Sequence, residues 1–154
     1  MSDSDTLILR LRSTLVDTEG AVWNTPELQE ALMQALADMR QAAGQAYSVG
    51  GLGGAAATSL PLEWFDLLVR GGAAYAVLSR AADRVDSYNF DAGLPVAALN
   101  VSAALMQRFV DGLTALARLR ISELQTAPAA PYPDGSDLLQ PGWKLPDELE
   151  SEGG

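Results

Sequence analysis

The chain changes character near Ala127, and this change limits what each part can fold into. Before this point alanine and leucine dominate, and apolar residues recur with helical spacing. After it the sequence is TAPAAPYPDGSDLLQPGWKLPDELESEGG, in which five prolines and a terminal glycine pair exclude a long helix or a central strand. We therefore predict a helical bundle domain over residues 1–125 and an extended, largely irregular, proline-rich acidic tail over residues 126–154.

Apolar periodicity divides the first part into four helical segments. Leu7, Leu11 and Leu15 define the first segment, and every later segment repeats apolar residues three or four positions apart. Four helices joined by short connections are typical of an all-α helical bundle. The predicted helices are residues 4–17, 25–44, 59–85 and 95–125.

The second helix has the clearest local start signal. Thr25 is suited to cap it, Pro26 supplies a preset φ at the first helical position, and Glu27 lies near the positive end of the helix dipole. Trp23, just before this start, can fold back as a hydrophobic staple on the first turn.

Two glycine clusters interrupt the helical pattern. Gly71 and Gly72 lower helix propensity, which indicates either a kink or a close approach of another backbone. Residues 44–58 have no periodicity and are predicted to be a flexible loop. This loop contains the sequence 51–56, which fits the loose G-x-G-x-x-A dinucleotide fingerprint, but the fingerprint requires a preceding strand that residues 45–48 do not predict.

The chemistry of the chain argues against catalysis. It has no cysteine and no histidine, so thiolate nucleophiles, imidazole acid-base chemistry and Cys/His zinc sites are excluded. The carboxylate pairs Glu63/Asp66 and Asp83/Asp86 are spaced to share a helix face, but surface charge explains them better than a metal or acid-base site. We therefore expect no enzyme activity and no catalytic, cofactor-binding or metal-binding residue. A bundle enzyme that uses these carboxylates is a third hypothesis.

Charge and hydropathy restrict the partners. The net charge is −10, whereas a protein that wraps nucleic acid needs a basic stripe. The N-terminal sequence MSDSDT lacks the features of a secretory signal, and the longest uncharged stretch, residues 41–62, is too weakly apolar to span a bilayer. We expect neither export nor membrane insertion.

Two sets of residues are candidates for protein contacts. Large side chains in a tail that has no core of its own indicate docking on a partner, although packing of Trp143 on its own bundle remains an alternative. Arginines outside the apolar stripes indicate a possible subunit interface, with ordinary solubilising charge as the alternative. The tail set is Tyr132, Leu138, Leu139, Trp143 and Leu145, and the arginine set is Arg10, Arg12, Arg118 and Arg120.

The order of these elements resembles the head-tail connector, or adaptor, proteins of tailed bacteriophages and related gene transfer agents. The resemblance covers residues 7–125 and is one of pattern. A short amphipathic helix ends in Asp, a Trp precedes a capped helix, and an alanine-rich helix follows. The segments that carry it are LILRLRSTLVD, VWNTPELQEALMQALADM and WFDLLVRGGAAYAVLSRAADR.

The resemblance implies a structural virion protein that forms a ring, commonly of twelve subunits, between the portal and the tail or stopper protein. In that family the C-terminal segment reaches the portal, so the matching residues here are 126–154. DNA would pass through the channel only as cargo, and the protein would be assembled in the host cytoplasm and reside in the neck of the virion. The alternative is a small helical protein-binding module, a regulator or chaperone that holds a peptide in the bundle groove and has no virion role.

Overall fold

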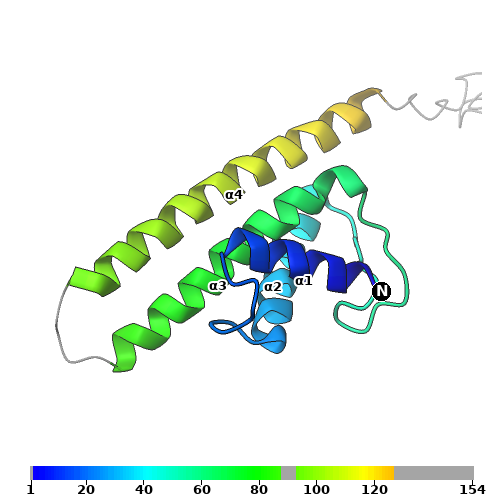
Figure 1. Ribbon diagram of the computed structural model, residues 1–154. Helices are drawn as coiled ribbons and strands as arrows, with labels where there is room; N and C mark the ends of the chain where they lie inside the picture. Colours follow the sequence, from blue (N-terminus) through cyan, green and yellow to red (C-terminus); the bar gives the residue numbers. More distant parts are fainter. Residues whose placement is uncertain (1, 88–92, 127–154) are drawn as a thin grey trace, which may run out of the picture. The chain divides into compact units, whose positions relative to one another are not determined.

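The computed structural model describes residues 2–87 and 93–126, which contain four α-helices and no β-strand (Figure 1). The all-α helical bundle predicted from the sequence is confirmed. The chain divides into two units, Met1–Ile121 and Ser122–Gly154, so the division falls four residues before the predicted boundary at 125. The helices are α1 (Asp3–Thr14), α2 (Thr25–Ala43), α3 (Phe65–Ser87) and α4 (Gly93–Thr126), and a 3-10 turn, η1 (Leu62–Trp64), precedes α3.

One hydrophobic core joins the four helices of the first unit. The apolar residues of each helix recur every three or four positions, so they form a stripe that the other helices cover. Burial of each large side chain contributes roughly 1.5–3 kcal/mol. The largest fully buried side chains are Phe109, Leu7, Leu11, Leu28, Leu32, Met39, Leu68 and Val49.

The glycine pair of α3 is a site of close packing within an uninterrupted helix. A Cβ atom added at Gly71 would lie 2.5 Å from the ring of Phe109 on α4 and 2.7 Å from Cβ of Ala35 on α2. A Cβ atom at Gly72 would lie 2.8 Å from Leu32. The pair is thus a site of close approach, but the atoms that approach it belong to side chains and not, as the sequence suggested, to another backbone.

The N-cap of α2 lies one residue before the predicted one. Asn24, not Thr25, is the N-cap: its side-chain oxygen accepts a hydrogen bond from the Glu27 amide at 2.9 Å, and the Glu27 carboxylate accepts one from the Asn24 amide at 2.8 Å. This reciprocal capping box satisfies two amides at once, and Asn ranks above Thr as a cap. Pro26 follows within the first turn, where its missing N–H leaves no bond unmade.

α1 ends three residues before the predicted Asp17, in a Schellman motif. The Asp17 amide donates to the Arg12 carbonyl at 2.9 Å, and the Val16 amide donates to the Ser13 carbonyl at 3.2 Å. The motif places Val16 in the left-handed region, with φ 55°, a conformation that β-branched residues avoid. Because Val16 is also 90% exposed, no packing of its side chain within the first unit offsets this strain.

Replacing Val16 with glycine is therefore expected to stabilise the protein. Relief of the left-handed strain contributes roughly 1–2 kcal/mol, and the greater freedom of glycine in the unfolded chain removes roughly half of that gain. Urea unfolding followed by circular dichroism should show a higher midpoint for Val16→Gly and a lower or unchanged one for Thr18→Gly, a control in the same turn. A destabilised Val16→Gly variant would contradict this account of the turn.

The loop after α2 is ordered, which the sequence did not predict. The Ser4 amide donates to the Gly50 carbonyl at 3.1 Å, and the Gly50 amide donates to the Thr58 hydroxyl at 2.8 Å. The Thr58 hydroxyl in turn donates to the Asp3 carboxylate. Residues 45–48 form no strand, so the glycine-rich segment lacks the context of a dinucleotide site. Its backbone is instead fixed against the start of α1, and three of its apolar side chains are buried: Val49, Leu52 and Leu60.

Candidate functional site

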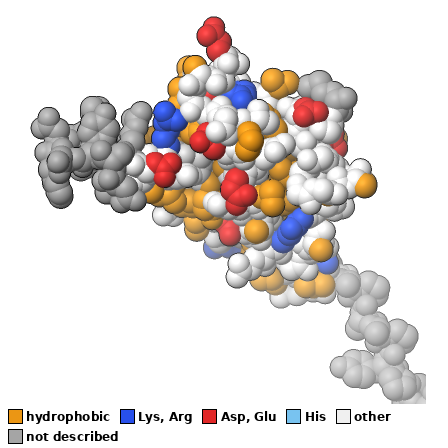
Figure 2. Space-filling view, turned by 90° about the horizontal axis from the view of Figure 1, so that it is seen from below, with side chains coloured by type: hydrophobic (Ala, Val, Ile, Leu, Met, Phe, Trp, Pro, Cys, Tyr) orange, Lys and Arg blue, Asp and Glu red, His pale blue; other side chains and the backbone are white. Residues whose placement is uncertain are grey.

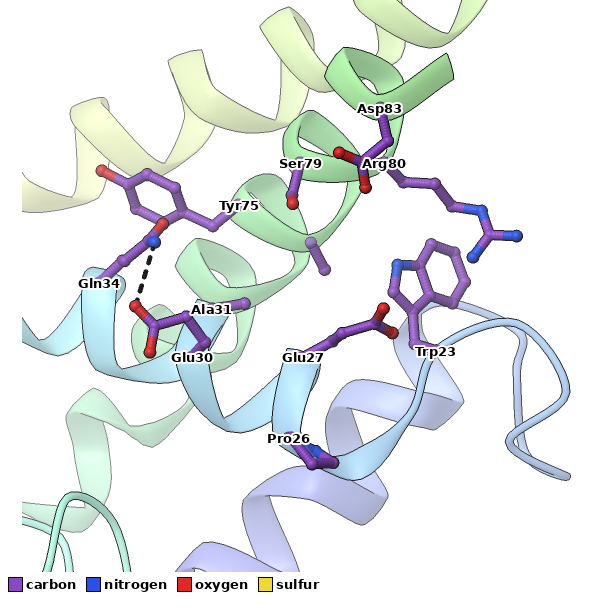
Figure 3. A pocket seen from close by; sticks show the side chains of 11 residues that line it. Trp23, Pro26, Glu27, Glu30, Ala31, Gln34, Tyr75, Ser79, Arg80 and Asp83 are labelled. Carbon is purple, nitrogen blue, oxygen red and sulfur yellow. Dashed lines mark hydrogen bonds between the residues drawn. The ribbon is translucent and has the colours of Figure 1, made fainter. Parts of the chain in front are cut away.

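A hollow of about 330 Å³ lies between α2 and α3 (Figure 3). One wall comes from the first half of α2, the other from the middle of α3, and Trp23 lies at one end just before α2. Its lining mixes carboxylates, one arginine and two large aromatic rings. The lining residues are Trp23, Pro26, Glu27, Glu30, Ala31, Gln34, Tyr75, Ala76, Ser79, Arg80 and Asp83.

Trp23 and Arg80 form one end of the hollow. The Arg80 guanidinium lies 5.4 Å from the centre of the Trp23 ring, a cation-π contact, and donates a hydrogen bond to the Val22 carbonyl at 2.5 Å. Figure 3 shows the indole nitrogen on the side of the ring that faces α3. This buried nitrogen has no hydrogen-bond partner among the described residues. A peptide carbonyl or a carboxylate is the kind of group that it would bind.

The opposite end of the hollow is more tightly bonded. The Tyr75 hydroxyl donates to the Asp38 carboxylate at 2.5 Å, which joins α3 to α2 and raises the pKa of Tyr75 to about 12. The Tyr75 ring also meets Phe109 edge to face, with centroids 6.4 Å apart. Ser79 has no imidazole near it in a chain without histidine, so the hollow lacks the base that a serine nucleophile needs.

Asp17 organises the loop that carries Trp23. Its carboxylate accepts hydrogen bonds from the amides of Val22 and Trp23, both at 3.0 Å, and the Arg12 guanidinium lies 3.4 Å away. The bond from the Trp23 amide is the largest cause that lowers the pKa of Asp17 below its usual value, and the positive charge of Arg12 adds to it. Asp17 is almost fully buried, so the loop depends on its charged form.

The stability of the protein is therefore expected to fall in mild acid. Because the pKa of Asp17 is lower in the folded state, its contribution is fully present above the unfolded value near 3.9 and is lost as the pH falls through the folded value. Asp17→Asn should lower the unfolding temperature at pH 7. The further decrease in unfolding temperature below about pH 4 should be smaller in this variant than in the unmodified protein. Glu19→Gln, in the same turn but exposed, should leave both unchanged. Parallel pH profiles for all three proteins would contradict this role.

The two arginines of α1 have different surroundings. Arg10 forms an exposed ion pair with Asp66 at 3.5 Å, which leaves it accessible to a neighbouring subunit. Arg12, which we expected to face solvent or another subunit, instead donates to the Trp23 carbonyl at 3.0 Å and pairs with Asp17. The prediction failed for Arg12 because its partners lie in the following loop, where helical spacing carries no information.

The arginines of α4 also differ. Arg118 is exposed. Arg120 is partly buried. When the side-chain amide of Gln45 is oriented with its oxygen toward Arg120, this oxygen accepts two hydrogen bonds from the guanidinium, at 2.8 and 3.1 Å. The remaining candidates, Tyr132, Leu138, Leu139, Trp143 and Leu145, lie outside the described residues.

Of the two carboxylate pairs, only Glu63, Asp66 and Asp83 have described side chains. Asp66 pairs with Arg10, and Asp83 lines the hollow. Within residues 2–87 and 93–126, no group of three or more Asp, Glu, His or Cys side chains could hold a metal ion.

α4 has an exposed apolar surface that the sequence did not predict. Leu99 and Leu124 recur at helical spacing with Phe109 and Leu116, but both are exposed, because only the row that contains Phe109 and Leu116 is buried. Elsewhere, Figure 2 shows a face on which acidic and basic side chains are scattered among hydrophobic ones. The exposed large apolar residues of α4 are Leu99, Val101, Val110, Leu119, Ile121 and Leu124.

The hollow was also missed from the sequence. Trp23 was assigned a local packing role, and Arg80 received no role, because their contact joins residues 57 positions apart. The only available signal was an aromatic residue in a polar turn.

None of the described helices is long and apolar enough to cross a membrane. The chain matches no protein-family model, no curated protein and no solved structure with which it was compared.

Proposed function

We propose that this chain is a structural head-tail adaptor of a tailed bacteriophage or gene transfer agent. In this role it forms an oligomeric ring around the DNA channel, between the portal and the tail or stopper protein, in the neck of the virion. The observation that carries the proposal is the exposed apolar surface of α4, the helix that precedes the segment 127–154 in the sequence. A helix with this much uncovered apolar surface is typical of a protein that functions in an assembly.

Two further features support the proposal. The order and character of the helices fit the resemblance to the connector family over residues 7–125. The net charge of −10 also suits a channel wall, because an acidic surface repels phosphate and does not retain passing DNA.

The tail completes the proposed division of roles. Its apolar residues Tyr132, Leu138, Leu139, Trp143 and Leu145 act as anchors on the portal or on another neighbouring protein. Burial of Trp143 and the leucines offsets the entropy lost when the segment becomes ordered. The bundle, in contrast, forms the ring through head-to-tail contacts that close.

Electron microscopy and native mass spectrometry of the protein mixed with its portal test this role. We expect rings for the full chain, much weaker portal binding for a chain that ends at Thr126, and an intermediate loss for Trp143→Ala. Tyr47→Ala, which removes an aromatic side chain outside the tail, is the control for Trp143→Ala and should leave portal binding unchanged. Circular dichroism should show that the shortened chain keeps its helices. A monomer that does not bind the portal would refute the adaptor role.

The hollow between α2 and α3 favours a second candidate, a helical module that binds a peptide. The unpaired indole nitrogen of Trp23 and the nearby carboxylates of Glu27 and Glu30 suit a peptide with a free carbonyl and a basic side chain. An isolated monomer whose tail resists proteolysis would favour this candidate over the adaptor.

A further inference from the structure

Seven residues of α4 form one uninterrupted apolar stripe, which we call the α4 stripe. Successive members are three or four positions apart, and at 100° per residue they fall within an arc of about 80°. No charged or polar residue lies within this arc between the first and last member. The members are Leu99, Ala103, Met106, Val110, Leu113, Ala117 and Ile121.

The α4 stripe lies beside the buried row of α4, not within it. Phe109 is fully buried and Leu116 is 3% exposed, so this row faces the core. On the stripe, Val110 is 44% exposed and Ile121 54% exposed. Met106 and Leu113, on the edge of the stripe nearest this row, are partly buried and pack against the core, whereas Leu99, Val110 and Ile121 remain exposed.

The spacing of the α4 stripe fits packing against another helix. The steps alternate between four and three residues from Leu99 to Ala117, the pattern by which one helix presents a continuous apolar seam to a second. From residue 99 to residue 121 the stripe is about 33 Å long.

Charge indicates what the partner is. α4 carries three arginines and two acids, a net charge of +1, whereas residues 2–83 carry ten acids and five arginines, a net charge of −5. α4 is thus a basic element on an acidic protein, and its complement is the acidic part of the same chain in another molecule. A basic surface that meets an acidic one is a head-to-tail contact, the kind that generates rings.

We propose that the α4 stripe is the surface by which one copy of this chain packs on the acidic part, residues 2–83, of a second copy. This inference rests on the proposed ring and names the contact within it. One exposed arginine beside the stripe, Arg118, orients the contact, and the apolar residues supply its stability.

Glutamate substitutions on the two flanks of α4 test this contact. Val110→Glu and Ile121→Glu place a charge within the stripe, whereas Val101→Glu and Leu119→Glu place one on the other flank, where the exposed fractions are similar at 54% and 52%. Sedimentation velocity and native mass spectrometry should show self-association at least about tenfold weaker for the stripe pair, because a charge is buried unpaired. The control pair should associate like the unmodified chain. Circular dichroism confirms that each variant is folded.

Photo-crosslinking provides a second measurement that does not add charge. A photoreactive amino acid at position 110 should yield a product of twice the subunit mass, and the same residue at position 119 should not. Equal weakening by both pairs of substitutions, crosslinks from both positions, or an unmodified chain that stays monomeric would overturn the inference. Rings that persist in the stripe variants when the portal is present would overturn the α4 contact and leave the adaptor role intact. Rings of the full chain that do not bind the portal would overturn the adaptor role and leave the α4 contact intact.

Discussion

Phe109→Ala is expected to lower the free energy of unfolding by about 3–5 kcal/mol, the range for loss of a large aromatic side chain from a core. Phe109 is the largest fully buried side chain, lies against Gly71, and meets the Tyr75 ring edge to face. A domain of this size is stable by only about 5–15 kcal/mol, so a large part of its stability would be lost. Urea unfolding at pH 7 measures the change.

The matched control is Leu119→Ala on the same helix, where an exposed side chain is also replaced by alanine. It should change the free energy by less than about 0.5 kcal/mol. A similarly small effect for Phe109→Ala would mean that α4 does not pack on α3 in solution. The result for Phe109→Ala therefore also tests the α4 stripe, because the stripe is exposed only if α4 buries the row that contains Phe109.

Gly71→Ala is expected to destabilise the protein although alanine is the better helix former. The added methyl group would lie 2.5 Å from the Phe109 ring and 2.7 Å from Ala35, so helices must move apart. Overpacking of this kind costs roughly 1–3 kcal/mol, against a propensity gain of up to about 1 kcal/mol. The net loss should appear as a lower midpoint in urea.

Gly112→Ala on α4 is the control for Gly71→Ala, because it brings the same gain in helix propensity. The atom that its methyl group would meet is the end of the Leu67 side chain, which can rotate away. Gly112→Ala should therefore be much less destabilising. In a Phe109→Ala background, part of the cost of Gly71→Ala should also disappear, since the ring is gone. Equal effects of the two glycine substitutions would contradict the packing that we describe.

Much of the fold could be predicted from the sequence because its determinants are local. The apolar spacing of Leu28, Leu32 and Met39 predicts both a helix and its buried face, and the Asn24-to-Glu27 segment marks its start. The cap was misassigned to Thr25 because Asn24 and Thr25 are both good caps, and only the reciprocal bonds with Glu27 decide between them.

The parts that could not be predicted depend on residues far apart in the sequence. The loop after α2 is fixed by Asp3 and Ser4, about 50 residues earlier, so its composition alone indicated flexibility. Arg12 and Arg80 meet partners in a turn, where no periodic pattern applies. The exposure of Leu99 follows from which flank of α4 meets α3, and helical spacing does not specify this when apolar residues occupy more than one flank.

The contact of α1 with Gly72 has a consequence for synthesis of the protein on the ribosome. α1 has 12 residues, a length at which an isolated helix is marginal in water. Leu11 packs where Gly72 lacks a side chain, and residues near Gly50 bond to the first turn of α1. α1 therefore leaves the exit tunnel some 60 residues, several seconds of translation, before the surface that stabilises it. Until then its leucines are exposed to chaperones.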